Sequence, residues 1–194
     1  MKSSRIQSID ILRGLVMVIM ALDHVRDYFH LGAWLYDPTD LETTTPVLFF
    51  TRFVTHFCAP VFIFLTGTSA SLFGQNKSKK SLSKFLFTRG LWLIFVEIVI
   101  MNFLWWFDPA FGHIGLQVIW AIGLCMIFLA ILIHLPFKIL ILISLTIIFG
   151  HNLLDGFTVK GYELTSILWY IFHQVGHLPI GSDHMVGFYY PVLP

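Results

Sequence analysis

The segment from Ser8 to His30 constrains this chain most, because its apolar centre is bounded by charged residues at both ends. Between Ile11 and Leu22 the single charged side chain is Arg13. As a helix, about 23 residues at about 1.5 Å per residue are long enough to cross the hydrocarbon core of a bilayer. Ionisable groups at membrane depth are costly and need a partner or a water-filled cavity. The segment therefore predicts a membrane helix with polar chemistry at both ends.

The composition places the rest of the chain in a lipid bilayer as well. Of its 194 residues, 57% are hydrophobic and 12% are charged, which lies well outside the usual composition of a soluble domain. The formal net charge is +1, so the chain has no basic field for nucleic acid, and it lacks the aromatic and basic motif of RNA-binding modules. We expect the bilayer as a partner and no nucleic acid.

Five apolar segments predict five membrane-spanning helices, so the expected fold class is all-α, a polytopic bundle. The segments are 8–30, 47–73, 85–107, 113–135 and 137–153. Pro60 should kink or open the second helix. Leu164 to Val175 follow helical spacing, which predicts an amphipathic helix at the membrane interface. The chain stops at GFYYPVLP, which is similar to the entry to a sixth span. We therefore expect residues 1–194 to form one domain that is the N-terminal part of a larger bundle.

The lysine and arginine residues predict the orientation. They precede the first span, surround the connection 74–84 and recur at Lys138. Because Lys and Arg are enriched in cytoplasmic connections, the N-terminus is expected in the cytoplasm. Of the 9 histidines, His134 then lies inside. The other histidines lie at or near the outer face.

Two of these outer histidines are best placed for chemistry, since each lies on a predicted span beside other ionisable groups. Asp27 follows His24 by three residues, and Arg52 precedes His56 by four, so the members of each pair share a helical face. A histidine with a carboxylate neighbour is suited to general-base work near neutral pH. For any one histidine, an interfacial side chain without a catalytic role is the competing interpretation. A metal is not predicted, because HExxH and compact Cys/His spacings are absent from the sequence.

Polar residues also occur at the opposite end of the first span and inside the third. Asp10 and Arg13 are three residues apart and most simply form an ion pair, although Arg13 could instead hold a phosphate or an anionic donor. Glu97 in mid-span is expected to pair with Arg89 or with a helix outside this sequence. Gln117 and Asn102 could hydrogen-bond across to other helices.

The phrase SIDILRGLVMVIMALDHVRDYF, followed by DPTDLETTTPVLFFTRFVTHFCAPVFIFLTGTSASL, closely resembles the bacterial branch of the heparan-alpha-glucosaminide N-acetyltransferase-like membrane proteins. The resemblance is specific from Arg5 to Leu72 and looser over GHIGLQVIWAIGLCMIFLAIL and FYYPVLP. It implies a membrane acyltransferase that takes an acyl group from cytosolic acyl-CoA, such as acetyl-CoA, and delivers it to a glycan or similar acceptor on the other side. It also implies a bacterial inner membrane.

The resemblance further implies a catalytic histidine near the outer end of the first spans. His24 occupies the first-helix position used by related acyltransferases, whereas His30 is an approximate match to a histidine of the family's first outer loop. Combined with the helical spacings, this gives four catalytic candidates: His24, Asp27, His30 and His56. The substrate-binding candidates are Asp10, Arg13, Asp23 and Arg52.

Two other classes of protein fit the same residues. A proton-coupled transporter or permease also carries ionisable side chains inside the membrane, where they relay protons or bind substrate. A non-enzymatic membrane scaffold is the third possibility.

Overall fold

The computed structural model describes residues 6–32 and 35–193, and the chain divides into two compact units, Met1–Leu72 and Phe73–Pro194. Each unit is considered by itself. The expectation of a single domain over residues 1–194 stays a prediction.

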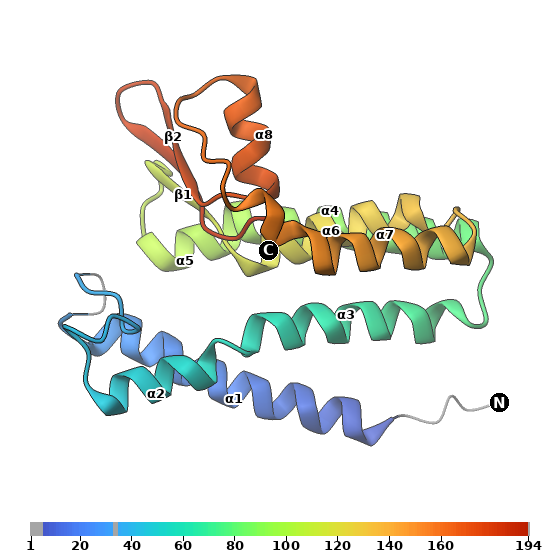
Figure 1. Ribbon diagram of the computed structural model, residues 1–194, viewed down its shortest axis with the longest axis horizontal. Helices are drawn as coiled ribbons and strands as arrows, with labels where there is room; N and C mark the ends of the chain where they lie inside the picture. The colour runs from blue at the N-terminus through green and yellow to red at the C-terminus, as the bar shows by residue number, and fades with distance from the viewer. Residues whose placement is uncertain (1–5, 33–34, 194) are drawn as a thin grey trace. The chain divides into compact units, whose positions relative to one another are not determined.

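The described part of the first unit is helical (Figure 1). Its helices are α1 (Gln7–Phe29), α2 (Pro46–Thr55) and α3 (Cys58–Gly74), the last of which runs on into the first residues of the second unit. Thr45 caps α2, since its side chain accepts a hydrogen bond from the N–H of Leu48. The interruption expected at Pro60 falls one turn before it, between α2 and α3. A proline has no N–H to bond the carbonyl four residues earlier, which here belongs to His56.

The second unit contains the remaining helices, of which α4 and α6 lie side by side (Figure 1). Their close approach depends on two glycines. A Cβ atom added to Gly90 would lie 2.6 Å from the carbonyl oxygen of Gly123, and one added to Gly123 would lie 2.9 Å from that of Gly90. Small residues allow membrane helices to pack backbone to backbone in this way. The helical elements are α4 (Lys79–Phe95), the π-helical η1 (Val96–Met101), α5 (Asn102–Trp106), α6 (Val118–Leu132), α7 (Phe137–Gly150), the 3₁₀ turn η2 (His151–Leu154) and α8 (Leu164–Phe172).

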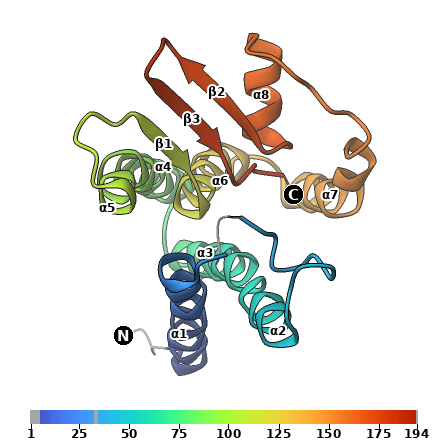
Figure 2. The ribbon, with the colours of Figure 1, turned by 90° about the vertical axis from the view of Figure 1, so that its left-hand side faces the viewer.

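A small sheet in the second unit corrects the expected all-α fold. Its strands are β1 (His113–Leu116), β2 (Gly176–Ile180) and β3 (His184–Phe188), in the order β1-β3-β2. β3 pairs in parallel with β1 and antiparallel with β2 (Figure 2). One face of the sheet packs into a core of Leu116, Tyr170 and Phe188 that includes α8.

This sheet also changes the boundaries of two expected segments. The helix predicted over 113–135 begins only at Val118, because the residues before it form β1. The segment expected to enter a sixth span, 187–194, instead ends β3 at Phe188 and continues without a helix to residue 193. The predicted amphipathic helix is present as α8 and ends at Phe172.

Among the described residues, three helical stretches are long and apolar enough to cross a membrane, judged by length and composition: Pro46–Gly74, Lys79–Trp106 and Phe137–Leu154. Val118–Leu132 is apolar but has only 15 residues. α1 has 23 residues, but the charged side chains at both of its ends lower its overall apolarity. The chain is thus a membrane protein by composition, and the number of five spans stays a prediction.

Candidate functional site

The carboxylate of Asp23 is the centre of a polar cluster between α1 and α2. It forms ion pairs with Arg26 on the same helix and with Arg52 on α2, each with a nitrogen–oxygen distance of 2.9 Å. The buried hydroxyl of Thr55 donates a third contact to it at 2.8 Å. α1 and α2 are therefore joined by charged groups near the C-terminal ends of both helices.

Arg26 extends this cluster to a second carboxylate. Its Nη2 donates to Oδ1 of Asp27 at 2.7 Å and its Nε donates to the same oxygen at 3.2 Å. The side chains of Asp23, Arg26 and Asp27 are between 12% and 19% exposed. Two carboxylates and two guanidinium groups balance one another, which meets the requirement that ionised groups removed from water be paired. We call Asp23, Arg26, Asp27, Arg52 and Thr55 the Asp23 cluster.

The three histidines proposed from the sequence lie on or beside the same helix ends. His24 follows Asp23 directly on α1, and it is half-buried. His30 caps the C-terminus of α1, and its ring Nδ1 accepts a hydrogen bond from the N–H of Gly32 at 3.2 Å. A neutral imidazole that accepts at Nδ1 carries its proton on Nε2. His56 is exposed at the end of α2.

The structure brings some predicted pairs together and leaves others as predictions. Asp27 forms an ion pair with Arg26. The expectation that Asp27 orients the imidazole of His24 stays a prediction. Arg52 joins the site through Asp23, which lies 29 residues earlier in the chain, rather than through His56 one turn away. The sequence placed Asp23 among the binding candidates but assigned it no partner.

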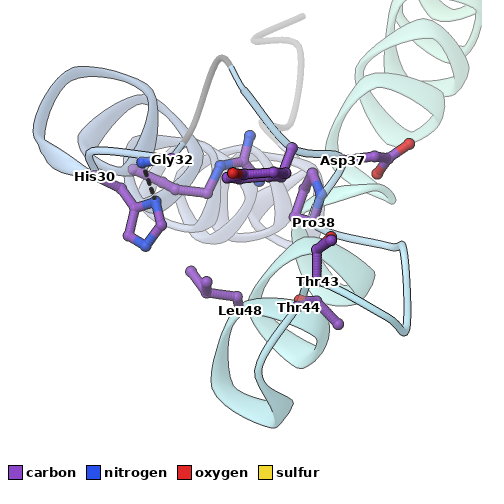
Figure 3. Close-up of a pocket in the computed structure, with 9 residues that line it drawn as sticks. His30, Gly32, Asp37, Pro38, Thr43, Thr44 and Leu48 are labelled. Carbon is purple, nitrogen blue, oxygen red and sulfur yellow. Dashed lines mark hydrogen bonds between the residues drawn. The ribbon is translucent and has the colours of Figure 1, made fainter.

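A pocket lies beside the Asp23 cluster and shares Arg26 with it. Its volume is about 330 Å³ when the solvent-filled opening is included. Figure 3 shows His30 and Leu48 on one side of this pocket and Asp37 pointing away from the imidazole. The hydroxyl and the backbone N–H of Thr39 both donate to Asp37 and lower the pKa of that carboxyl. Asp37 therefore stays ionised and stabilises its own turn. The lining residues are Arg26, His30, Gly32, Tyr36, Asp37, Pro38, Thr43, Thr44 and Leu48.

Arg13 lies ten residues before Asp23 on α1, about 15 Å away at the helical rise. Its guanidinium donates a hydrogen bond to the hydroxyl of Ser69 on α3. This contact joins the N-terminal half of α1 to α3. The ion pair expected between Asp10 and Arg13 stays a prediction, and these two residues belong to the opposite end of the helix from the Asp23 cluster.

In the second unit, Glu97 has a different partner from the one expected. Its side chain is 2% exposed, and its carboxylate accepts the backbone N–H of Trp120 at 3.1 Å. Trp120 lies in the first turn of α6, which receives no side-chain cap from Gln117, the residue before the helix. A carboxylate at the N-terminus of a helix accepts hydrogen bonds from the free N–H groups of the first turn and interacts favourably with the helix dipole. Glu97 therefore caps α6, while Arg89 lies over the ring of Phe85.

Asn102 bonds to a strand rather than to another helix. Its Nδ2 donates to the carbonyl oxygens of Glu97 and Gly115, at 2.7 Å and 3.1 Å. Its Oδ1 accepts the N–H of Gly115. The π-helical turn is thereby fixed to β1.

Two further histidines have specific partners that the sequence did not indicate. His113 and Tyr189 share a hydrogen bond of 3.0 Å between the ring Nε2 and the phenol oxygen. Buried His173 places its Nε2 3.1 Å from Oδ1 of Asp155. No local signal could have found these pairs, since their members are far apart in the chain. Among the described residues, no group of three or more His, Cys, Asp and Glu side chains is arranged to hold a metal ion.

Apolar helices, a half-buried cluster of ion pairs at the helix ends and an adjacent pocket define a membrane protein with a polar site. The family described as "Heparan-alpha-glucosaminide N-acetyltransferase, catalytic" matches residues 5–194, and the chain belongs to this family. The match confirms the resemblance found in the sequence and indicates a transferase of the membrane acyltransferase type. No curated protein and no solved structure matches the chain.

Proposed function

We propose that this protein transfers an acyl group, acetyl in the first instance, from cytosolic acyl-CoA to a glycan or similar acceptor outside the cytoplasm. The observation that carries the proposal is the match to a catalytic acetyltransferase family over residues 5–194. The proposal includes several passes through a bacterial inner membrane, with the N-terminus in the cytoplasm. The orientation is supported by the lysine-rich start of α4, since cytoplasmic connections are rich in lysine and arginine.

The reaction needs a base for the acceptor. In the proposed mechanism, an acceptor hydroxyl or amine attacks the acyl carbonyl while His24 takes its proton. The new acyl–oxygen or acyl–nitrogen bond forms, the carbon–sulfur bond of the thioester breaks, and coenzyme A leaves as the thiolate. An acyl group carried for a time on His24 is the covalent version of the same step.

The residues around His24 have separate roles in this mechanism. Asp23 and Arg52 hold the ends of α1 and α2 together, so they are positioning residues. Arg26 lines the pocket, and because its charge is paired with Asp23 and Asp27 it is a positioning residue as well. His30, whose proton is on Nε2, can donate a hydrogen bond to the oxygen that gains negative charge on the acyl carbon.

The proposal is tested in inverted membrane vesicles, whose cytoplasmic face is outward. Radiolabelled acetyl-CoA is added outside and glucosamine is trapped inside, and we expect label to appear on the trapped sugar. Loss of a positioned base costs about 10²–10⁴-fold in rate, so His24→Ala should abolish transfer while expression and insertion persist. His134→Ala, at the other end of the predicted topology, is the matched control.

Two outcomes would contradict this assignment in different ways. If His24→Ala kept wild-type turnover while His30→Ala or His56→Ala lost it, the catalytic histidine would be wrong but the acyltransferase would stand. If the wild-type protein accumulated sugar without covalent change, the transporter alternative would replace the acyltransferase.

A further inference from the structure

The connection between α3 and α4 carries a dense group of positive charges. It joins two helical stretches that are long and apolar enough to cross a membrane, Pro46–Gly74 and Lys79–Trp106, so residues 75–78 lie at a membrane surface. The cationic side chains on and just after this connection belong to the second unit and are all exposed. We call them the basic cluster, and its members are Lys77, Lys79, Lys80, Lys84 and Arg89.

The basic cluster has no carboxylate to neutralise it. The sequence contains no Asp or Glu between Glu42 and Glu97, and Glu97 is buried as the cap of α6. Among the described residues, the ion pairs are formed by other side chains. The positive charge of the basic cluster is therefore available to an anion from outside the chain.

An aromatic pair holds two of the cations in place. The rings of Phe73 and Phe85 stack at 4.2 Å between centroids and 25° between planes. Nζ of Lys77 lies 5.7 Å from the centroid of the Phe73 ring, and Cζ of Arg89 lies 5.6 Å from that of the Phe85 ring. A cation over a ring is attracted to it but keeps its charge and its N–H donors. Both cations are thus positioned and still able to bind an anion.

The backbone that carries the lysines is also fixed. A Cβ atom added to Gly74 would lie 2.7 Å from Cδ2 of Leu82, so the end of α3 packs directly on the first turn of α4. The N–H of Lys77 bonds to the carbonyl of Gly74 at 3.1 Å. The hydroxyl of Ser78 caps α4 by accepting the N–H of Ser81 at 3.3 Å. The positive charges are therefore presented by a tight, capped turn.

The depth of Arg89 indicates which kind of anion fits. Arg89 follows Lys79 by ten residues, about 15 Å along α4, and exposed Phe87 and Leu91 flank it. An exposed cation in an apolar stretch of a membrane helix needs an anionic partner at that depth. A phospholipid supplies one, because its phosphate lies at the interface and its acyl chains match the apolar side chains beside Arg89. Clusters of Lys and Arg next to a membrane helix are typical of binding to anionic lipids.

We propose that the basic cluster is a binding site for the phosphate headgroup of an anionic phospholipid. In this site the lysines and Arg89 contact the phosphate, and the acyl chains lie along the exposed apolar side chains of α4. The inference assigns a lipid neighbour and no substrate, so it does not depend on the proposed acyl transfer. It involves residues of the second unit alone.

The test counts lipids bound to the purified full chain. The protein in a neutral detergent is titrated with phosphatidylglycerol, which is anionic, or with phosphatidylcholine, which has no net charge, and bound lipids are measured by native mass spectrometry. We expect phosphatidylglycerol to bind more tightly. A cation near the membrane surface contributes about fivefold to the affinity for an anionic lipid. Lys84→Gln and Arg89→Gln should therefore each weaken phosphatidylglycerol binding by about fivefold and leave phosphatidylcholine binding unchanged.

Two variants separate the site from net charge and from folding. Lys138→Gln is the matched control, because it removes the same charge from an exposed position in the first turn of α7. It should bind phosphatidylglycerol like the wild-type chain. Arg89→Lys retains the charge and should keep most of the affinity. An unchanged thermal midpoint in each variant shows that the fold is retained.

Three results would overturn the inference. They are equal affinity of the wild-type chain for the two lipids, equal weakening by Lys138→Gln and Arg89→Gln, and displacement of bound phosphatidylglycerol by an equal concentration of coenzyme A. The last result would assign the basic cluster to a soluble phosphate compound instead. Loss of phosphatidylglycerol binding in Arg89→Gln would support the site whether or not the chain transfers an acetyl group, so the inference and the proposed function can fail separately.

Discussion

Replacing Asp23 with Asn tests whether the Asp23 cluster joins α1 to α2. The change preserves the shape of the side chain but removes its charge, leaving Arg26 and Arg52 without one of their carboxylates. Thr55 can still donate to the amide oxygen of the asparagine, so its contact is retained. The expected loss therefore comes from the two ion pairs.

The size of the expected loss in stability follows from the solvent exposure of the two ion pairs. Charge-assisted hydrogen bonds contribute about 1.5–3 kcal/mol when buried, whereas fully exposed pairs contribute about 0–1 kcal/mol. The Arg52 and Asp23 side chains are 27% and 18% exposed, so each pair falls near the lower end, at about 1 kcal/mol. We expect Asp23→Asn to lower the free energy of unfolding by about 2 kcal/mol in total, measured by titrating mixed micelles with a denaturing detergent.

A double-mutant cycle isolates the contact between the two helices. Asp23→Asn and Arg52→Gln should each destabilise, and their combination should cost about 1 kcal/mol less than the sum. Asp40→Asn is the matched control, because among the described residues this exposed carboxylate bonds only to its own turn, at Glu42 and Thr43. Additivity of the two changes within about 0.3 kcal/mol would refute the reasoning, since residues without mutual contact behave in that way.

Three further predictions concern packing, capping and topology. Glu97→Ala should lower the thermal midpoint more than Glu97→Gln, because glutamine keeps an acceptor for the first turn of α6 and alanine does not. Gly90→Val should separate α4 from α6 and cost about 3 kcal/mol or more, since its Cβ would meet the carbonyl oxygen of Gly123. In a variant without native cysteines, a membrane-impermeant thiol reagent added outside cells should label Glu42→Cys and spare Ser78→Cys, both of which are exposed positions.

The controls for these predictions come from the same elements. Gly67→Ala on α3 introduces a Cβ with nothing within 4 Å, so it should leave the stability of the chain unchanged or slightly higher. An equal midpoint for Glu97→Ala and Glu97→Gln would contradict the capping role. Labelling of Ser78→Cys but not Glu42→Cys would reverse the predicted orientation.

Apolar runs in the sequence were sufficient to locate most helices. The expected segment 137–153 corresponds to α7 and η2, and the helical spacing from Leu164 onward predicted α8. The sheet was missed for a physical reason. β1 is only four residues long and directly precedes an apolar helix, and its partner β3 lies some 70 residues later, so no local periodicity could distinguish it from the first turns of a span.

The candidate site was predicted in its members but not in its contacts. Helical spacing compares residues three or four apart, so it paired His24 with Asp27 and Arg52 with His56. The structure instead joins Arg52 to Asp23 across two helices, where a guanidinium on one helix neutralises a carboxylate on the other and both are partly withdrawn from water. A pair of this kind depends on how α2 is placed against α1, which spacing along one helix does not encode.

The same pairing determines what Asp23 and Arg52 can contribute to activity. The carboxylate of Asp23 is paired with both Arg26 and Arg52, so Asp23 and Arg52 are poorly placed to take or give a proton during acyl transfer. Their effect on the reaction should instead pass through the position of His24, which is adjacent to Asp23 on the same turn of α1. Asp23→Asn should then reduce kcat through misplacement of the base, with residual transfer that His24→Ala lacks. If Asp23→Asn abolished transfer as completely as His24→Ala in a chain of unchanged stability, Asp23 would have to act on the substrate directly.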